Sequence, residues 1–308
     1  MDIVYRSIAD MNEAILRNLN KIPHDIDLVV GIPRSGMLPA NLIALYLNKP
    51  FTDLDSFIEG RIYSSGYRGQ FISQSGNSKV LVVDDSICSG SAQNKAKNKL
   101  GGKVKDYNIL WGVVYATEDS KNKVDFYCEV TEVNRFFQWN LIHHDEYLQR
   151  SFFDIDGVLC PNPPIDDDGP QYKSYIENAP LLFQPSTTID TLITCRLEKY
   201  RSITEKWLSE NDIRYNRLIM LNLPNKSARI KWNKHGVFKG NYYKNSNAIL
   251  FVESSLQEAK DIIKVAKKPV FCIENFSLMN YVENPLRVRL RILYWKLRSK
   301  VLNILQRR

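Results

Sequence analysis

The sequence predicts an α/β protein with two doubly wound parallel-sheet domains, followed by a basic C-terminal helix. Short apolar strands alternate with amphipathic helical stretches along most of the chain. Two of these strands run into paired aspartates, at Val80–Asp85 and Ser151–Asp156, and doubly wound sheets bind ligands at the carboxyl ends of their strands. A length of 308 residues suits about two domains of ordinary size.

The predicted elements occur in alternating order along the chain. Strands are expected at Leu28–Gly31, Val80–Val83, Asn108–Tyr115, Phe152–Ile155, Thr191–Ile193, Ala248–Val252 and Val270–Ile273. Helices are expected at Ser7–Leu19, Leu38–Leu47, Ala92–Leu100, Lys199–Glu210 and Leu256–Ala266, the last two with clear helical spacing of apolar residues. A boundary near Arg150 separates the two aspartate motifs, which predicts domains at 1–150 and 151–284 and a tail at 285–308.

Composition and charge restrict the class of protein. The chain is 44% hydrophobic and 25% charged, and no run approaches the roughly 20 apolar residues that a membrane-spanning helix needs. Its five cysteines are scattered and odd in number, which is typical of the reducing cytoplasm. The net charge of +8 comes from the tail, because removing its eight Lys and Arg from the total of 42 leaves 34, equal to the 34 Asp and Glu. A neutral body disfavours nucleic acid as a partner.

The first aspartate motif has the features of a site for a phosphorylated sugar. Val80–Ala92 reads VLVVDDSICSGSA: an apolar strand, two carboxylates and a short loop of small and hydroxyl residues. Asp84 and Asp85 can accept hydrogen bonds from vicinal ribose hydroxyls, and loop amides followed by a helix N-terminus suit a phosphate dianion. The alternative is an ordinary polar loop after a strand. A second strand with a tight turn, Asp27–Met37 (DLVVGIPRSGM), favours the functional interpretation.

The first motif resembles the phosphoribosyl pyrophosphate (PRPP) loop of type I phosphoribosyltransferases, and Asp27–Met37 resembles the pyrophosphate loop of that family. The resemblance implies PRPP as substrate and Mg²⁺ as cofactor. It implies a PRPP-binding set of Arg34, Ser35, Gly36, Asp84, Asp85, Ser86, Ile87, Cys88, Ser89, Gly90 and Ser91. Asp55–Gln70 would be a hood over PRPP, in which Arg61 and Arg68 bind phosphate or are simply solvated. Purine-salvage members carry an acid where this chain has Cys88, which disfavours purine salvage.

The second aspartate motif, SFFDIDGVLC at Ser151–Cys160, resembles the nucleophile motif of haloacid-dehalogenase-type (HAD) phosphatases. The resemblance implies that Asp154 attacks phosphorus, and that Asp156 protonates the leaving group and then activates water. Residues two apart on a strand face the same side, so both carboxylates can reach one phosphate. Thr194 would hold a phosphoryl oxygen, and Lys239, or failing that Lys244, would neutralise charge.

The same resemblance implies Mg²⁺ held by Asp154, the backbone carbonyl of Asp156, and Glu253. The family usually has a second acid after the position of Glu253, whereas this chain has Ser254 and Ser255, which leaves the metal affinity open. The acidic run Asp166–Asp168 either binds sugar hydroxyls or is a solvated loop. A HAD-type fold used only for binding is the alternative for this half.

The tail carries an apolar stripe at helical spacing, flanked by its basic residues. The stripe comprises Leu286, Leu290, Leu293, Leu297, Val301 and Ile304. Such a helix predicts peripheral contact with an anionic membrane, and the alternative is a helix packed on the body or on a partner subunit.

The two resemblances together predict a bifunctional enzyme similar to bacterial glycan ribofuranosyltransferase systems, located at the inner face of the cytoplasmic membrane. It would transfer 5-phosphoribosyl from PRPP to a hydroxyl of a polyprenyl-diphosphate-linked glycan and then remove the 5-phosphate. The acceptor sugar and the base that deprotonates it are not assigned. Two alternatives stay open: a nucleobase-salvage phosphoribosyltransferase with a nucleotidase domain, and a non-catalytic PRPP sensor.

Overall fold

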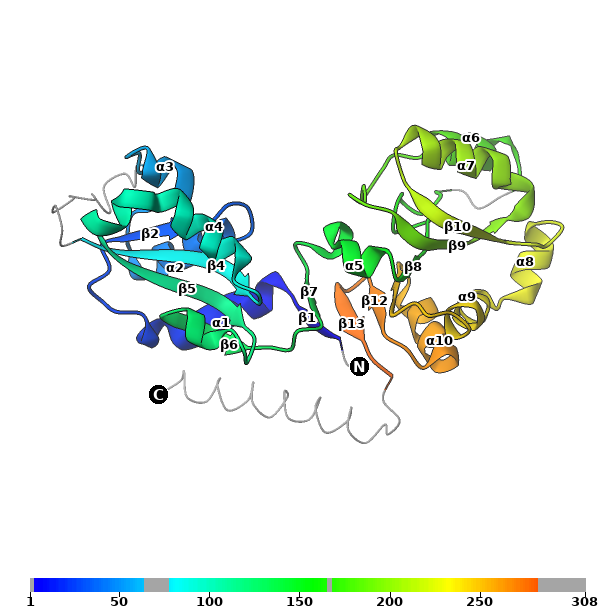
Figure 1. Cartoon of the computed structure of the whole chain (residues 1–308). Helices are drawn as coiled ribbons and strands as arrows, with labels where there is room; N and C mark the ends of the chain where they lie inside the picture. The colour runs from blue at the N-terminus through cyan, green and yellow to red at the C-terminus, as the bar shows by residue number, and fades with distance from the viewer. Residues whose placement is uncertain (1–2, 64–77, 165–167, 282–308) are drawn as a thin grey trace, which may run out of the picture. The chain divides into compact units, whose positions relative to one another are not determined.

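In a computed structural model the chain forms two compact units, Met1–Leu141 and Ile142–Arg308 (Figure 1). The structure describes residues 3–63, 78–164 and 168–281. The division lies nine residues before the predicted boundary at Arg150. Helix α5 (Asp145–Leu148) belongs to the second unit, because the backbone oxygen of Arg150 accepts a 2.8 Å hydrogen bond from the amide of Ile249, and the hydroxyl of Ser151 donates to the backbone oxygen of Tyr147.

The first unit contains a five-stranded, fully parallel sheet. Its order is β3 (Phe51–Asp53), β2 (Leu28–Gly31), β4 (Lys79–Ile87), β5 (Asn108–Ala116) and β6 (Phe126–Val130). A separate parallel pair is formed by β1 (Val4–Arg6) and β7 (Arg135–Phe137). Both faces of the larger sheet are covered. Helices α1 (Ile8–Asn18) and α2 (Met37–Leu47) pack with Val29 and Leu81, whereas α3 (Leu54–Ile58) and α4 (Ser91–Leu100) pack with Val30 and Val82.

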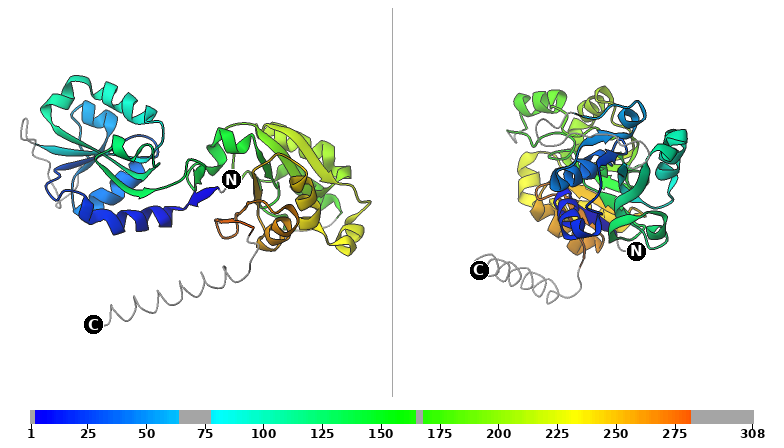
Figure 2. Two further views of the ribbon diagram at one scale, coloured as in Figure 1. Left: turned by 60° about the horizontal axis from the view of Figure 1, so that its bottom comes forward. Right: turned by 90° about the vertical axis from the view of Figure 1, so that its left-hand side faces the viewer.

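This double coverage follows from the sequence of the central strands. Successive side chains of a strand point to opposite faces, and β2 and the Val80–Val83 part of β4 are buried and apolar at every position. Such strands bury both faces only when helices lie on each side, as in doubly wound α/β folds. Figure 2 shows the helices on both sides of each sheet.

The second unit contains a six-stranded sheet. Its order is β10 (Tyr215–Leu221), β9 (Ile189–Leu197), β8 (Ser151–Phe153), β11 (Leu250–Glu253), β12 (Val270–Cys272) and β13 (Ser277–Met279), parallel except for β13. Helices α9 (His235–Lys244) and α10 (Leu256–Ala266) pack on one face against Phe152, Ile193 and Phe251. Helices α6 (Pro170–Asn178), α7 (Arg201–Glu210) and α8 (Lys226–Trp232) contribute to a cluster with the ends of β9 and β10. Short 3₁₀ turns are η1 (Leu19–Lys21), η2 (Gly101–Asp106), η3 (Lys121–Lys123), η4 (Leu141–His143) and η5 (Glu198–Tyr200).

The α/β class and the parallel sheets predicted from the sequence are confirmed, and two strand ends differ in ways that matter for the sites. Strand β4 continues to Ile87, because Asp84 and Ser86 still pair with Val113 and Tyr115 of β5. Strand β8 ends at Phe153 rather than Ile155, since the next residues form a turn in which the amide of Gly157 donates to the oxygen of Cys160 at 2.7 Å. Helix α9, which carries Lys239, was not predicted.

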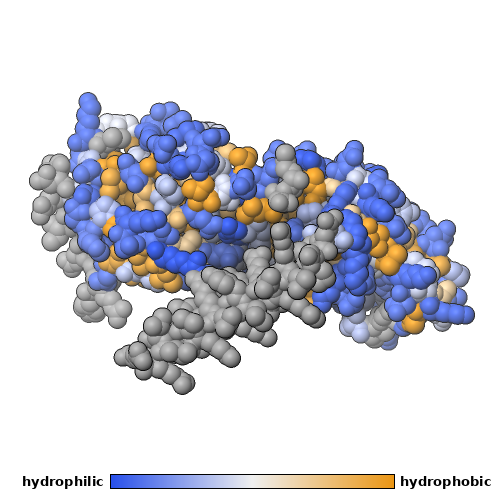
Figure 3. Space-filling view, turned by 90° about the horizontal axis from the view of Figure 1, so that it is seen from below, coloured by the Kyte–Doolittle hydropathy of each residue, from blue (hydrophilic) through white to orange (hydrophobic). Residues whose placement is uncertain are grey.

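Several predictions concern residues outside the described ranges: the tail 285–308, Arg68, Asp166 and Asp167. In the described part of the chain, no helix is long and apolar enough to cross a membrane. Large apolar side chains that stay exposed, such as those of Leu45, Val133, Leu182 and Ile230, are spread over both units. On the face seen in Figure 3, apolar patches are interspersed with hydrophilic side chains.

Candidate functional sites

Each unit gathers polar side chains at the carboxyl end of its central strand. In the first unit these residues follow β4, and in the second they follow β8. Neighbouring strands and helices supply the remaining side chains.

The first candidate site is a cavity of about 450 Å³ beside the last residues of β4. Of the predicted PRPP-binding set, it is lined by Asp84, Ser86, Ile87, Cys88, Ser89, Gly90 and Ser91. Trp111 and Arg135 complete the wall together with the first turn of α4. The predicted loop therefore does surround a space large enough for a small ligand.

The two aspartates of β4 have different surroundings, because adjacent residues of a strand point to opposite sides. Asp84 lines the cavity. Asp85 instead accepts a 2.7 Å hydrogen bond from the indole Nε1 of Trp139, whose ring stacks on Phe137 with centroids 4.7 Å apart. The sequence analysis did not identify Trp139, since nothing in its local sequence links it to a residue 54 positions away.

The Asp84 carboxyl is buried without a basic partner among the described residues. Burial and the nearby Asp85 raise the pKa of Asp84 to about 8. A carboxyl in this state takes up a proton near neutral pH, because two close carboxylates are costly to ionise together. A ligand that brings hydroxyl donors and a cation would relieve that cost.

The Asp27–Met37 segment approaches the same strand end. A Cβ on Gly36 would lie 2.6 Å from the backbone oxygen of Val83 and 2.9 Å from the Cα of Asp84, so only glycine allows this contact. Arg34 is exposed, Ser35 is half-buried, and the peptide between Pro33 and Arg34 is cis. These three residues of the predicted set are placed beside β4 by the chain turn, although the cavity lining does not include them.

The loop after β4 is fixed by hydrogen bonds to the last residue of that strand. The backbone oxygen of Ile87 accepts hydrogen bonds from the Ser120 hydroxyl at 3.0 Å and from Nη2 of Arg135 at 3.1 Å. Gly90 has a φ of +87°, a left-handed conformation that favours glycine, and α4 begins at the next residue. In the predicted hood, Arg61 is exposed and pairs with Glu59 at 2.5 Å.

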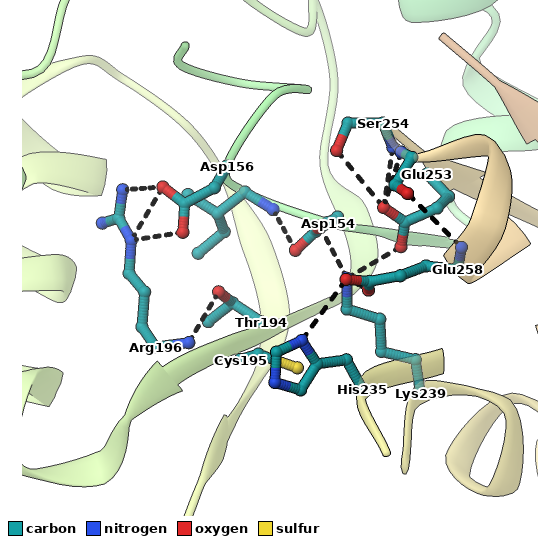
Figure 4. Close-up of polar contacts among 12 residues, drawn as sticks. Asp154, Asp156, Thr194, Cys195, Arg196, His235, Lys239, Glu253, Ser254 and Glu258 are labelled. Carbon is teal, nitrogen blue, oxygen red and sulfur yellow. Dashed lines mark hydrogen bonds and ion pairs between the residues drawn. The ribbon is translucent and has the colours of Figure 1, made fainter. Parts of the chain in front are cut away.

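The second candidate site is organised around the buried ammonium of Lys239 in α9. Its Nζ lies 2.7 Å from Asp154, 2.8 Å from Glu253 and 2.7 Å from Glu258, all carboxylate oxygens (Figure 4). Lys239 is 2% exposed, and Asp154 and Glu253 are buried. Lys244, the other lysine considered, is exposed at the end of the same helix. The structure thus brings Lys239, and not Lys244, to Asp154.

Glu258 is a functional candidate that the sequence analysis missed. Ser255 caps the N-terminus of α10, and the first turn of that helix brings Glu258 back beside Glu253. In the sequence, Glu253 and Glu258 are visible as two acids five positions apart. This spacing brings the two carboxylates together only because a helix begins between them, at Leu256. Position 157 must be glycine, because a Cβ there would lie 2.4 Å from the Cβ of Ser254. The second acid therefore comes from α10 rather than from the position after Glu253.

Asp156 has different hydrogen-bond partners from Asp154. The rule that residues two apart on a strand face the same side does not apply to Asp154 and Asp156, because β8 ends before Asp154. Asp156 is held by Arg196, whose Nε lies 3.2 and 3.0 Å from its two oxygens and whose Nη2 lies 2.7 Å from one of them (Figure 4). Arg196 is 1% exposed, and its Nη1 has no hydrogen-bond partner among the described residues.

Thr194 lies on β9 between these two groups. Its side chain is buried, and its Oγ1 accepts a 3.1 Å hydrogen bond from the amide of Arg196. The hydroxyl proton is thereby left to donate to a ligand oxygen.

The charges of the second site fit a divalent cation. Ligand oxygens of Asp154, Glu253 and Glu258 lie within 4.8 Å of one another, and oxygen ligands suit Mg²⁺. Three carboxylates with the single ammonium of Lys239 leave a formal charge of minus two when all are ionised. Burial favours the neutral form of Glu258, but Lys239 and His235 outweigh it and lower the pKa of Glu258 to about 2. Burial raises the pKa of Asp154, although Lys239 opposes this.

Comparisons with known proteins give similarities at low coverage. No protein-family model matches the chain, and no curated protein matches its sequence. Among solved structures, a purine phosphoribosyltransferase from Pyrococcus horikoshii is 19% identical with a TM-score of 0.35, covering 45% of this chain and 95% of that one. A Helicobacter pylori xanthine-guanine-hypoxanthine phosphoribosyltransferase is 16% identical with a TM-score of 0.33, covering 45% and 93%. An Aeropyrum pernix orotate phosphoribosyltransferase is 19% identical with a TM-score of 0.27, covering 37% and 61%. These values assign neither activity nor substrate.

Proposed function

We propose that the chain is a bifunctional enzyme that transfers 5-phosphoribosyl from PRPP to an acceptor and then removes the 5-phosphate. The observation that carries this proposal is the pairing of two sites in one chain. One is a cavity walled by the Asp84–Ser91 loop, and the other is a nucleophile candidate, Asp154, held by Lys239. The first suits a sugar phosphate, and the second suits attack on a phosphate.

In the first step, the cavity loop would bind the 5-phosphate through its amides and the N-terminus of α4. Asp84 would accept hydrogen bonds from the ribose hydroxyls once a bound cation and ligand displace its proton. Asp85, which does not line the cavity, would hold this strand end in place through its hydrogen bond with Trp139. Mg²⁺ bound with PRPP would neutralise the leaving pyrophosphate.

In the second step, Asp154 would attack phosphorus while Lys239 holds the carboxylate in place. Thr194 would donate to a phosphoryl oxygen, and Asp156, oriented by Arg196, would protonate the leaving alkoxide and then activate water. Mg²⁺ would be held by Asp154, the Asp156 carbonyl and Glu253, with Glu258 as a further carboxylate nearby, and would offset the phosphate charge.

The acceptor we propose is a hydroxyl of a polyprenyl-diphosphate-linked bacterial glycan at the inner face of the cytoplasmic membrane. The neutral body and the basic tail at 285–308 support this choice, because an anionic membrane attracts basic residues at about 1 kcal/mol each. Nucleobase salvage and a non-catalytic PRPP sensor are the competing proposals.

The test is to incubate full-length protein with PRPP, Mg²⁺ and lipid-linked glycan acceptors and to weigh the products. We expect a ribosylated acceptor from the wild type and a phosphoribosylated acceptor from Asp154→Asn. The double variant Asp84→Asn, Asp85→Asn should form neither product, because each lost bond to a charged acceptor costs about 1.5–3 kcal/mol.

Other outcomes would decide against the proposal. Dephosphorylated product from Asp154→Asn at the normal rate would reject the phosphatase assignment. Turnover of purines or pyrimidines would favour nucleobase salvage instead. PRPP binding without pyrophosphate release with any acceptor would favour the sensor.

A further inference from the structure

A second group of metal-ligating side chains lies beside the Lys239 cluster. Cys195 of β9, His235 at the start of α9 and Glu258 of α10 each offer a ligand atom, and these atoms all lie within 4.8 Å of one another (Figure 4). Neither Cys195 nor His235 has a role in the chemistry proposed above. We infer that these three residues form a site for a thiophilic divalent cation of the Zn²⁺ type.

The donor set and its spacing suit such an ion. Zn²⁺ binds cysteine sulfur, imidazole nitrogen and carboxylate oxygen in tetrahedral sites, and three protein ligands leave one position for water. Metal–nitrogen and metal–oxygen bonds of about 2.0–2.2 Å at a tetrahedral angle place the two ligand atoms roughly 3.4 Å apart. The Nδ1 of His235 lies 3.4 Å from Oε1 of Glu258. Two of the three ligands are therefore already at the separation that a bound ion would require.

His235 is half-buried, and its Nδ1 faces Glu258. Its Nε2 is buried and has no hydrogen-bond partner in the described part of the chain. A buried imidazole that merely fills space normally has its nitrogens paired, because an unpaired buried polar atom is costly. Cys195 is half-buried, whereas Cys128, Cys160 and Cys272 are buried.

The inferred site is coupled to the Lys239 cluster through one carboxylate. Oε1 of Glu258 faces His235, whereas Oε2 of Glu258 lies 2.7 Å from Nζ of Lys239. The oxygen-only group of Asp154, Glu253 and Glu258 suits a hard cation such as Mg²⁺, and the group with sulfur and nitrogen suits a softer one. The two groups thus discriminate between cations while sharing Glu258.

The test is titration of chelator-treated full-length protein with Co²⁺, which adopts Zn²⁺ sites and gives a near-ultraviolet charge-transfer band when a thiolate binds it. We expect one equivalent to produce the band and Zn²⁺ to remove it. The near-isosteric Cys195→Ser should abolish the band and weaken Zn²⁺ binding by roughly 100-fold, and His235→Asn should weaken it at least about 10-fold. Circular dichroism of each variant checks that the fold is kept.

Two matched variants locate the ion. Cys88→Ser removes the exposed thiol of the other unit and should keep the band. Asp154→Asn alters only the oxygen-only group and should also keep it. Absence of the band in the wild type, or its survival in Cys195→Ser, would overturn the inference. Co²⁺ binding that is lost in Asp154→Asn but retained in Cys195→Ser would equally overturn it, by placing the ion in the carboxylate group. The result does not depend on phosphatase activity.

Discussion

The two units bury carboxylates at the ends of their central strands in opposite ways. Asp84 and Asp85 have no Lys or Arg partner among the described residues, and the pKa of Asp84 rises to about 8. In the second unit, Lys239 contacts three carboxylates and the pKa of Glu258 falls to about 2. Burial disfavours ionisation in both places and also raises the pKa of Asp154, whereas the neighbouring Lys239 and His235 lower the pKa of Glu258.

The presence or absence of a basic side chain beside the carboxyl groups indicates which ligand or reaction each site suits. Asp84 and Asp85 have no Lys or Arg partner among the described residues. Their oxygens can therefore accept hydrogen bonds from the hydroxyls of a ligand that also brings a cation. Asp154 and Asp156 are already held in place by Lys239 and Arg196, as a nucleophile and an acid–base group need to be.

The largest effect is expected from removing the central cation of the second unit. Lys239→Met should lower the free energy of unfolding by about 3–5 kcal/mol, because it leaves three buried carboxylates without a counter-charge. Lys244→Met, at an exposed position of the same helix, should change it by less than about 0.5 kcal/mol. Urea unfolding measures both. Equal stability of the two variants would mean that Lys239 does not balance the cluster.

A smaller, pH-dependent effect of opposite sign is expected in the first unit. The folded-state pKa of Asp84 is raised above the unfolded value of about 3.9, so folding takes up a proton between pH 4 and pH 8, and stability is lost as the pH rises through that range. Asp84→Asn removes this loss. The variant should be more stable than the wild type at pH 9 by on the order of 2 kcal/mol, with a smaller difference at pH 5.

Thermal unfolding at pH 5, 7 and 9 measures that difference. Asp119→Asn, the same exchange at an exposed position, serves as the control and should stay within about 0.5 kcal/mol of the wild type. A gain from Asp84→Asn that does not depend on pH would show that Asp84 is already ionised in the folded protein.

The pairing of Asp156 with Arg196 predicts a kinetic effect. Arg196→Lys keeps the positive charge but loses the fork that binds both oxygens of Asp156. Dephosphorylation should slow by about 100-fold, within the range of acid–base catalysis, and its pH–rate profile should shift. Phosphoribosyl transfer by the other unit should be unchanged. An unchanged pH profile at reduced rate would indicate a purely structural role for Arg196.

The smallest effect is expected at the contact between Trp139 and Asp85. Trp139→Phe keeps a ring that can stack on Phe137 but removes the indole donor. We expect the Kd for PRPP to rise by about 10-fold, since a hydrogen bond to a charged group is worth about 1.5–3 kcal/mol. Calorimetry measures the Kd. An unchanged value would mean that Asp85 is oriented without Trp139.

The sequence alone was sufficient for the fold class and for the strands that carry the sites. Strand β2 and helix α10 occur at their predicted bounds, and β4 and β9 extend beyond theirs. Local apolar periodicity and glycine turns determine these elements, and such signals lie within a few residues of one another. The aspartate motifs were readable for the same reason, because each directly follows its strand.

The tertiary structure alone decided which side chains meet. Lys239 contacts Asp154 across 85 positions, Arg196 contacts Asp156 across 40, and Trp139 contacts Asp85 across 54. No local pattern encodes such contacts, because they depend on where separate helices and strands dock on one sheet. The same holds for Glu258, which becomes a neighbour of Glu253 only because α10 starts at Leu256 and turns back toward β11. Charge balance in a buried site is a property of the assembled unit, and so the raised pKa of Asp84 and the lowered pKa of Glu258 could not be predicted from the motifs.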